Sequence, residues 1–267
     1  MYARNIVTLP THDHLLTDHK ALAEVRAGIE AGDVYVLKNA IAPSKILRLR
    51  KYLSQVGTHS LPAFQAIRVG CPNFHRINNW DPRSYVKGGF HQFSFFTWNQ
   101  DPIEMFKLFK NVYGVKNLLT GAPVESFLSE LPEHGCSARL SFHFYPAGVG
   151  GLHKHSDPVG AHQLTETVVV MSRKGQDFRK GGGFCERADG SRIMVEEYAD
   201  YGDVITWHCQ VPHGVEKVDP EETPDWLAFE GRWICVAAVN SVTADSGVTN
   251  AADLGSSDEK TSARALS

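Results

Sequence analysis

Apolar residues recur at helical spacing in the first half of the chain. Residues 18–32 and 44–57 place them every three or four positions, which predicts two amphipathic helices. Similar patterns predict helices over 103–113 and 123–131. Residues 58–102 follow no clear period, but their many aromatic side chains favour packing. We therefore expect this stretch to be an ordered, irregular segment with short strands.

The pattern changes to short strands from Ser137 onward, separated by turns rich in Gly, Pro and Asp. Many short strands in series are typical of a sandwich or jelly roll. The segments expected to form strands are 138–145, 164–171, 192–197, 203–208 and 231–239.

These patterns predict a mainly β protein with helical decoration, of the α+β class. A single domain over 1–242 would combine an N-terminal helical part (1–135) with a jelly-roll core at about 136–242. Residues 243–267 contain almost no large apolar side chains, so a disordered C-terminal tail is expected there.

Composition narrows the class of protein. The formal net charge is -3, so the sequence suggests no phosphate-binding surface and we expect no nucleic-acid partner. No apolar run approaches the length of a membrane span, and the N-terminus lacks the apolar region of a signal peptide. The five cysteines include no CxxC pair, which favours reduced thiols. We expect a cytoplasmic protein that does not associate with membranes; the sequence sets no expectation for its oligomeric state.

A candidate metal site stands out in the second half of the chain. His155 and Asp157 form an HxD pair, and His213 follows in the segment VPHGV. Two imidazoles and one carboxylate suit one face of an octahedral ferrous ion and leave three positions open. Two alternatives remain at this stage, because His153 competes with His155 and His208 competes with His213.

The strand that precedes the HxD pair indicates a polar pocket. Residues 139–145 read RLSFHFY, with apolar side chains at every second position. Because side chains alternate along a strand, Ser141, His143 and Tyr145 share one face. Such a row is more typical of a pocket wall than of a solvent face.

Arg232 opens the apolar run RWICVAAVN after the distal histidine. An arginine binds a carboxylate through two parallel hydrogen bonds and keeps its charge when buried. We therefore expect Arg232 to bind a carboxylate ligand rather than solvent.

Together these motifs resemble the Fe(II)/2-oxoglutarate-dependent dioxygenase superfamily. The resemblance covers about 138–240 and includes FYPAGVGGLHKHSDP, TETVVVMS, GGGF, YADYGDVITW, VPHGV and GRWICVAAV in the family's order. It departs from the usual pattern in the insertion DPEETPDWLAFE before Arg232. The resemblance implies a double-stranded β-helix, the cupin-like jelly roll of that family.

The resemblance also implies ligands. Fe(II) would be held by His155, Asp157 and His213, and O2 would bind beside the co-substrate 2-oxoglutarate. Arg232 would bind the distal carboxylate of 2-oxoglutarate, helped by Tyr145 or by a hydroxyl such as Thr165 or Thr167. Halogenases of this class typically carry Gly or Ala in place of the carboxylate ligand, so Asp157 favours hydroxylation or a related C–H oxidation.

A small polar molecule, such as an amino acid or a natural-product intermediate, is the expected substrate. Residues 68–98 are the candidate lid or substrate wall, although their aromatic residues are at least as well suited to packing the N-terminal helices onto the barrel. The preferred substrate contacts are Arg76, Asn79, Trp80, His91 and His143; Asn78 and Arg83 lie in the same segment.

Other functions remain open at this point. A cupin-like metal-binding protein without oxygenase activity would retain the metal but not turn over 2-oxoglutarate. A peptide or protein side-chain hydroxylase would share the same centre. A nucleic-acid demethylase of the AlkB type is disfavoured, because no second arginine follows Arg232 closely and the net charge is negative.

Overall fold

The computed structural model describes residues 1–160, 162–242 and 251–255. Its helices are α1 (His19–Glu30), α2 (Pro43–His59), α3 (Met105–Leu108), α4 (Lys110–Thr120) and the short 3-10 helices η1 (Asp13–Leu16) and η2 (Val195–Glu197). Its strands are β1 (Ile6–Leu9), β2 (Val34–Leu37), β3 (Phe74–Asn79), β4 (Gly88–Phe96), β5 (Cys136–Pro146), β6 (Gly151–Ser156), β7 (Thr165–Val170), β8 (Gly182–Glu186), β9 (Arg192–Met194), β10 (Val204–His208), β11 (His213–Glu216), β12 (Gly231–Ser241) and β13 (Ala252–Asp253).

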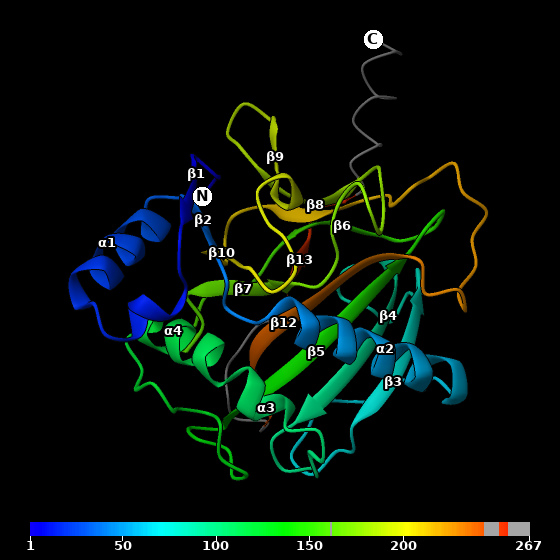
Figure 1. Cartoon of the computed structure of the whole chain (residues 1–267), viewed down its shortest axis with the longest axis horizontal. Helices are drawn as coiled ribbons and strands as arrows, with labels where there is room; N and C mark the ends of the chain where they lie inside the picture. The colour runs from blue at the N-terminus through cyan, green and yellow to red at the C-terminus, as the bar shows by residue number, and fades with distance from the viewer. Residues whose placement is uncertain (161, 243–250, 256–267) are drawn as a thin grey trace.

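The strands form one hydrogen-bonded system that folds over on itself. Their order is β1-β2-β10-β7-β12-β5-β4-β6-β11-β8-β9, with β3 added to β4 and β13 added to β6. Figure 1 shows β12, β5 and β4 as one layer, and β6 and β8 as a second layer above it. This arrangement is the expected double-stranded β-helix, so the prediction of a jelly-roll core with helices packed against it is confirmed.

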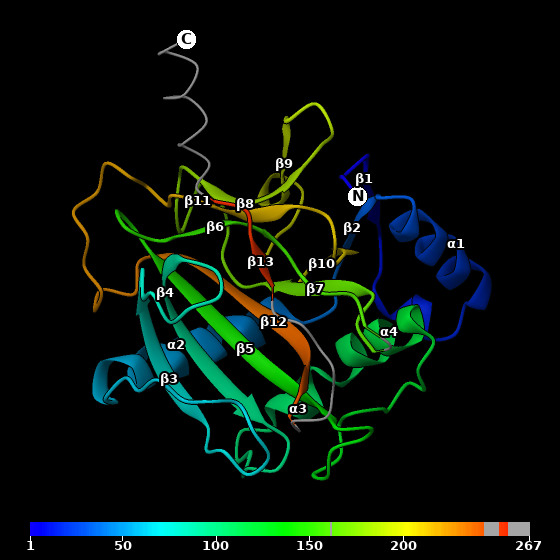
Figure 2. The ribbon, with the colours of Figure 1, turned by 180° about the vertical axis from the view of Figure 1, so that it is seen from behind.

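Two apolar clusters lie on opposite faces of the larger layer. Helix α2 covers one face, as the views from the front and from behind both show (Figures 1 and 2). The cluster beneath the helices includes Phe142, Phe144 and Trp233, whereas the cluster between the layers includes Val168 and Ile234. Strand alternation therefore sends odd-numbered residues of β5 inward, between the layers, as the sequence predicts.

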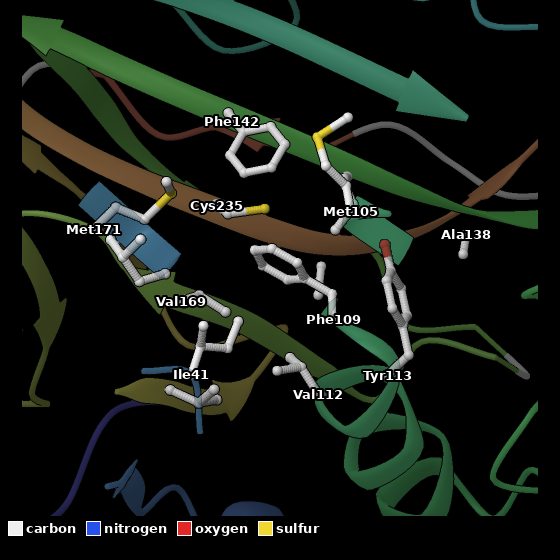
Figure 3. Packing of buried hydrophobic residues seen from close by; sticks show 14 of the residues in the cluster. Ile41, Met105, Phe109, Val112, Tyr113, Ala138, Phe142, Val169, Met171 and Cys235 are labelled. Carbon is white, nitrogen blue, oxygen red and sulfur yellow. The ribbon is translucent and has the colours of Figure 1, made fainter. Parts of the chain in front are cut away.

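Helix α4 closes the other end of the helix-covered face. Val112 and Tyr113 approach Val169 of β7, Phe142 of β5 and Cys235 of β12 (Figure 3). All of these side chains are buried, which fixes the helix against three neighbouring strands.

The helix expected over 123–131 is wrong. Residues there form turns, and Phe127 has a positive φ of 68°. The side-chain amide of Asn117 donates to the carbonyls of Val124 and Ser126, at 3.1 and 2.9 Å. Carbonyls bound in this way, next to a left-handed residue, do not continue an α-helix. The helix expected over 103–113 instead divides into α3 and α4, and α4 continues to Thr120.

Two expected irregular regions contain strands of the main sheet. Residues 58–102 supply β3 and the nine-residue β4, which pairs with β5 from His91 to Phe96. Residues 252 and 253, within the expected tail, form β13 and pair with β6. The rest of that tail, 243–250 and 256–267, lies outside the described residues. Within the described part, no helix has the length and apolar character that crossing a membrane requires.

A buried histidine pair lies on the helix-covered face of the sheet. His75 Nε2 is 2.9 Å from His91 Nδ1, and Ser60 Oγ is 2.8 Å from His75 Nδ1. The His91 ring packs among Phe93, Phe144 and other aromatic rings. Burial lowers the pKa of His75 to about 4 and that of His91 to about 3. Both imidazoles are therefore neutral in the folded protein near neutral pH.

This pair predicts a pH-dependent stability. The unfolded histidines take up protons below their ordinary pKa of 6.5, whereas the folded ones do so only near pH 4 and 3. The free energy of unfolding should therefore fall as the pH drops from 6.5 toward 4, by about 1.4 kcal/mol per pH unit for each proton. Denaturant titrations should show a shallower fall in His91→Phe than in the wild type. An equal slope in both proteins would contradict this account, and His59→Phe, at an exposed position, is the matched control.

Candidate metal centre

His155, Asp157 and His213 converge in the structure. One ligand atom from each lies within 4.8 Å of the other two. Asp157 Oδ2 is 3.2 Å from His213 Nε2, and Asp157 Oδ1 is 4.0 Å from His155 Nε2. Ligands in adjacent positions around a metal ion lie about 3 Å apart when the metal–ligand bonds are near 2.1 Å. The spacing and the N/O donor set therefore fit a ferrous ion.

Backbone carbonyls orient both imidazoles. His155 Nδ1 donates to the carbonyl of His153, and His213 Nδ1 donates to the carbonyl of Val211, each at 2.9 Å. Because Nδ1 is engaged, Nε2 of each ring is the atom available to a metal. The centre thus presents two oriented imidazole nitrogens beside one carboxylate.

A bulge in β6 decides between His153 and His155. Strand β11 pairs His213 with His155 and Val215 with Leu152, so β6 spans three residues where β11 spans two. The extra residue lets Leu152 and His155 both line the cavity between the layers. His153 lies outside that lining, and its Nδ1 is 3.3 Å from Asp253 Oδ1. Glycine at 214 permits this pairing, since a Cβ there would approach the carbonyl oxygens of His153 and Leu152 to 3.0 Å.

The other alternative is decided by strand alternation. Ile205 and Trp207 of β10 line the cavity, whereas His208 follows on the opposite face. His208 Nδ1 accepts from the backbone N–H of Gln210 at 3.2 Å. His213 is therefore the distal histidine of the cluster.

Asp157 and His155 have the ionisation states that bind a metal, whereas the pKa of His213, which burial acts to lower, is raised by the hydrogen bond and charge of Asp157. Burial, followed by the charge of His213, lowers the pKa of His155 to about 4, so this imidazole is neutral at neutral pH. Burial opposes ionisation of Asp157, but the hydrogen bond and charge of His213 keep the pKa of Asp157 below its ordinary value. Neutral imidazole and ionised carboxylate are the forms that bind a metal.

The metal cluster lies in a cavity of about 650 Å³ between the two layers. Its walls come from both layers, from α4 and from residues 64–67 and 83–86. Of the predicted site residues, the lining includes His143, Tyr145, Arg76 and Arg232 together with the three metal-ligand candidates.

Arg232 is buried at one end of this cavity. It is 3% exposed, its Nε is bonded to Glu196, and its guanidinium carbon lies 5.1 Å from the centre of the Tyr145 ring. Its Nη1 has no hydrogen-bond acceptor among the described residues. A Cβ at Gly183 would approach Nη2 to 2.6 Å, so the glycine makes room for the guanidinium. A buried donor without an acceptor is the expected state of an arginine whose partner is a ligand.

The polar row on β5 forms the cavity wall that the alternation predicts. The His143 ring nitrogens lie 3.0 Å from Ser141 Oγ and 3.3 Å from Tyr145 Oη. Burial, followed by the charges of Arg139, Arg232 and Arg76, lowers the pKa of His143 to about 3. Burial raises the pKa of Tyr145 to about 12. Both side chains are therefore neutral hydrogen-bonding groups near Arg232.

Several predicted contacts lie outside the cavity lining, and strand alternation explains those that lie on strands. Thr165 and Thr167 share the face of β7 opposite to Glu166 and Val168, which line the cavity, and Thr167 Oγ1 is 3.3 Å from Thr206 Oγ1. On β3 and β4, Asn78 and Phe90 face the cavity, whereas Asn79 and His91 do not. Trp80 follows β3 and packs 5.4 Å from the ring of His153. The substrate roles of Asn79, Trp80 and His91 and the co-substrate role of Thr167 are therefore not supported by the structure.

Three charged residues of the lining were not predicted from the sequence. Arg139 continues the Ser141, His143, Tyr145 row by two positions, so its place was readable from the alternation. Glu166 lies on the same inner face of β7 as Val168. Because nearly every residue of this strand is buried, the sequence pattern does not show which face lines the cavity. Lys116 is 2% exposed and lies on the part of α4 beyond the predicted helix. Burial, then the charge of Asp157, raises the pKa of Glu166 to about 7.

The geometry predicts which substitutions abolish metal binding. His155→Ala, Asp157→Ala and His213→Ala should each weaken binding of Mn(II) or anaerobic Fe(II) by at least about 100-fold, since each removes a ligand. Isothermal titration calorimetry measures this directly. His153→Ala and His208→Ala are the controls and should bind like the wild type; a large loss in either would contradict the ligand assignment.

Comparisons with known proteins reach only as far as the fold. No protein-family model matches the chain, and no curated protein matches it. Among solved structures, it is similar to a prolyl-4-hydroxylase from Pseudomonas putida, at 15% identity over 82% of this chain and 98% of that one, with a TM-score of 0.50. It is also similar to EctD from S. alaskensis with bound Fe, at 14% identity over 82% and 76% of the chains, also with a TM-score of 0.50. The chain thus has the fold shared by these proteins, as its resemblance to Fe(II)/2-oxoglutarate-dependent dioxygenases implies, with a His-Asp-His cluster inside it.

Proposed function

We propose that the protein is a non-haem Fe(II), 2-oxoglutarate-dependent dioxygenase that hydroxylates, or otherwise oxidises at a C–H bond, a small polar molecule, with release of succinate and CO2. The observation that carries the proposal is the coexistence, in one cavity, of the His155, Asp157, His213 cluster and a buried Arg232 with an unpaired Nη1. A metal-binding cupin without oxygenase activity has no need of the second feature.

Each residue has a defined task in this proposal. His155 Nε2, His213 Nε2 and the Asp157 carboxylate would hold Fe(II). With these ligands in place, the ion supplies the activation of O2 that is coupled to oxidative decarboxylation of 2-oxoglutarate. Arg232 binds the distal carboxylate of 2-oxoglutarate through Nη1, and Tyr145 offers a hydroxyl beside it.

Glu196 prepares Arg232 for that task. Its carboxylate accepts from Arg232 Nε and, at 2.8 Å, from the backbone N–H of Gly183. The guanidinium is thereby fixed in one orientation, with Nη1 left for the co-substrate. A donor that is already oriented loses less entropy when it binds a ligand.

The buried walls also protect the reaction from water. Phe90, Val168, Ile205 and Ile234 line the same cavity as the metal cluster and are almost fully buried. Excluding solvent favours oxidation of the bound substrate over side reactions.

The proposal predicts a visible metal-to-ligand charge-transfer band when Fe(II) and 2-oxoglutarate are added to the anaerobic protein. Asp157→Ala should weaken or lose the band because the iron site loses its carboxylate. Arg232→Lys should keep a counter-charge for Glu196 but raise the 2-oxoglutarate concentration needed for half-maximal absorbance by at least about tenfold, because the forked contact is lost.

Arg192→Lys is the matched control for this experiment. Arg192 also pairs with a glutamate, Glu216 at 2.6 Å, but lies outside the cavity. Its titration should match the wild type. Wild-type protein that binds Fe(II) yet gives no band with 2-oxoglutarate would overturn the proposal and favour a cupin-like metal-binding protein.

A further inference from the structure

One part of the cavity is lined by β3 and by the half of β5 nearest Ser137. It contains hydrogen-bond donors that the proposed co-substrate does not use. Arg76 and Asn78 come from β3, and Arg139 comes from β5. Arg76 Nε, Asn78 Nδ2 and Arg139 Nε are buried and have no acceptor among the described residues. These three groups are donors, and the cavity-lining Asn240 Oδ1 is a buried acceptor that is also unpaired among the described residues. A partner that satisfies the three donors must supply acceptors.

Neighbouring residues orient the side chains of Arg76 and Asn78 but provide no acceptor for Arg76 Nε or Asn78 Nδ2. The Arg76 guanidinium stacks over the Phe64 ring at 4.6 Å, and its Nη2 donates to Ser84 Oγ. Asn78 is 1% exposed, and its Oδ1 accepts from the backbone N–H of Asp81 at 3.1 Å. Because the amide oxygen is engaged, the amide nitrogen is left as the free end.

The positive side chains of this region also outnumber the carboxylates near them. Asp81, the carboxylate near Arg76, pairs with Arg83 at 2.6 Å. Near Arg139 the cavity holds the carboxylate of Glu166, but the ammonium of Lys116 lies close to that carboxylate as well. Arg232 has Glu196, and Asp157 belongs to the metal cluster. Arg76 therefore shares Asp81 with Arg83, and Arg139 shares Glu166 with Lys116, so the cations of this region outnumber its carboxylates.

His143 lies near these cations, but its imidazole is neutral and adds no positive charge. Strand register places Gln92 opposite both Arg76 and His143. The charges of Arg139, Arg232 and Arg76 all act on the His143 ring and help to keep it neutral. The wall near His143 is thus positive and polar.

We propose that the substrate carries a carboxylate, and that Arg76 and Asn78 bind it while Arg139 provides the second positive charge of this wall. The proposal rests on the proposed function, because it takes Arg232 to be occupied by 2-oxoglutarate. It deepens that function by naming the substrate class: small carboxylic acids, such as amino acids and hydroxy acids, rather than neutral or cationic molecules. Arg76 and Asn78 are then specificity-determining residues of the reaction.

The test uses matched pairs of probes. A panel of amino acids, hydroxy acids and aromatic acids, each paired with its primary amide, is titrated into protein that contains Mn(II) and saturating 2-oxoglutarate, so that Arg232 is occupied and no turnover follows. At least one acid should bind with a dissociation constant at least about tenfold lower than that of its amide. In Arg76→Gln and Asn78→Leu, the preference for the acid should shrink by a similar factor.

Arg192→Gln is the control variant, because Arg192 also stacks on an aromatic ring, Phe184 at 4.2 Å, already has a carboxylate partner in Glu216, and lies outside the cavity lining. It should bind the acids as the wild type does. A separate 2-oxoglutarate titration of every variant shows that the cavity and Arg232 remain intact. Equal affinity for acids and amides, no binding by any acid, or unchanged preference in Arg76→Gln would overturn the inference.

Two further outcomes distinguish failure of the carboxylate assignment from failure of the proposed function. Preference for an organic phosphate ester over the matched carboxylic acid would overturn the carboxylate assignment. Failure of 2-oxoglutarate to bind the wild-type protein would refute the proposed function, whereas an Arg76-dependent preference for acids in the same protein would still uphold the anion site.

Discussion

The pairing of β11 with β6 is the constraint on which the candidate site depends. It sets His213 opposite His155, and the bulge between Leu152 and His155 turns His155 rather than His153 toward the cavity. Carbonyls of the same two segments hold both Nδ1 atoms, so the backbone that builds the layer also orients the ligands. Asp157 follows directly after β6, where its backbone N–H is held by the carbonyl of Cys209 at 2.9 Å. The position of all three metal-ligand candidates is therefore set by the pairing of the sheet and its hydrogen bonds.

The buried Arg232–Glu196 ion pair is a second feature that the fold must accommodate. Burying an ion pair costs desolvation energy that close hydrogen bonds must offset. Here Gly183 supplies both the space for the guanidinium and a backbone donor for Glu196. The β5 residues beside this pair, Tyr145 and His143, are neutral, so Glu196 is the carboxylate that balances Arg232, and Nη1 is left without an acceptor among the described residues.

Much of this arrangement was readable from residue types and spacing. The HxD pair, the distal histidine, Arg232 and the alternating row on β5 all appear in the sequence, because strand period and ligand chemistry are local properties. The choice between His153 and His155 was not readable, since a bulge breaks the two-residue period. Glu196, which holds Arg232, comes from a 3-10 turn whose position is set only by tertiary packing. The sequence does not show that Thr167 and His91 face away from the cavity, because their strands are buried on both sides and carry no clear alternation.

The central claim is that one cavity holds both the metal and 2-oxoglutarate. A crystal structure of the protein with Mn(II) and 2-oxoglutarate, with the metal located by anomalous scattering, tests it most directly. The account predicts Mn(II) bound to His155 Nε2, His213 Nε2 and the Asp157 carboxylate, with the distal carboxylate of 2-oxoglutarate on Arg232. Metal bound elsewhere, or a co-substrate whose distal carboxylate does not contact Arg232, would contradict it.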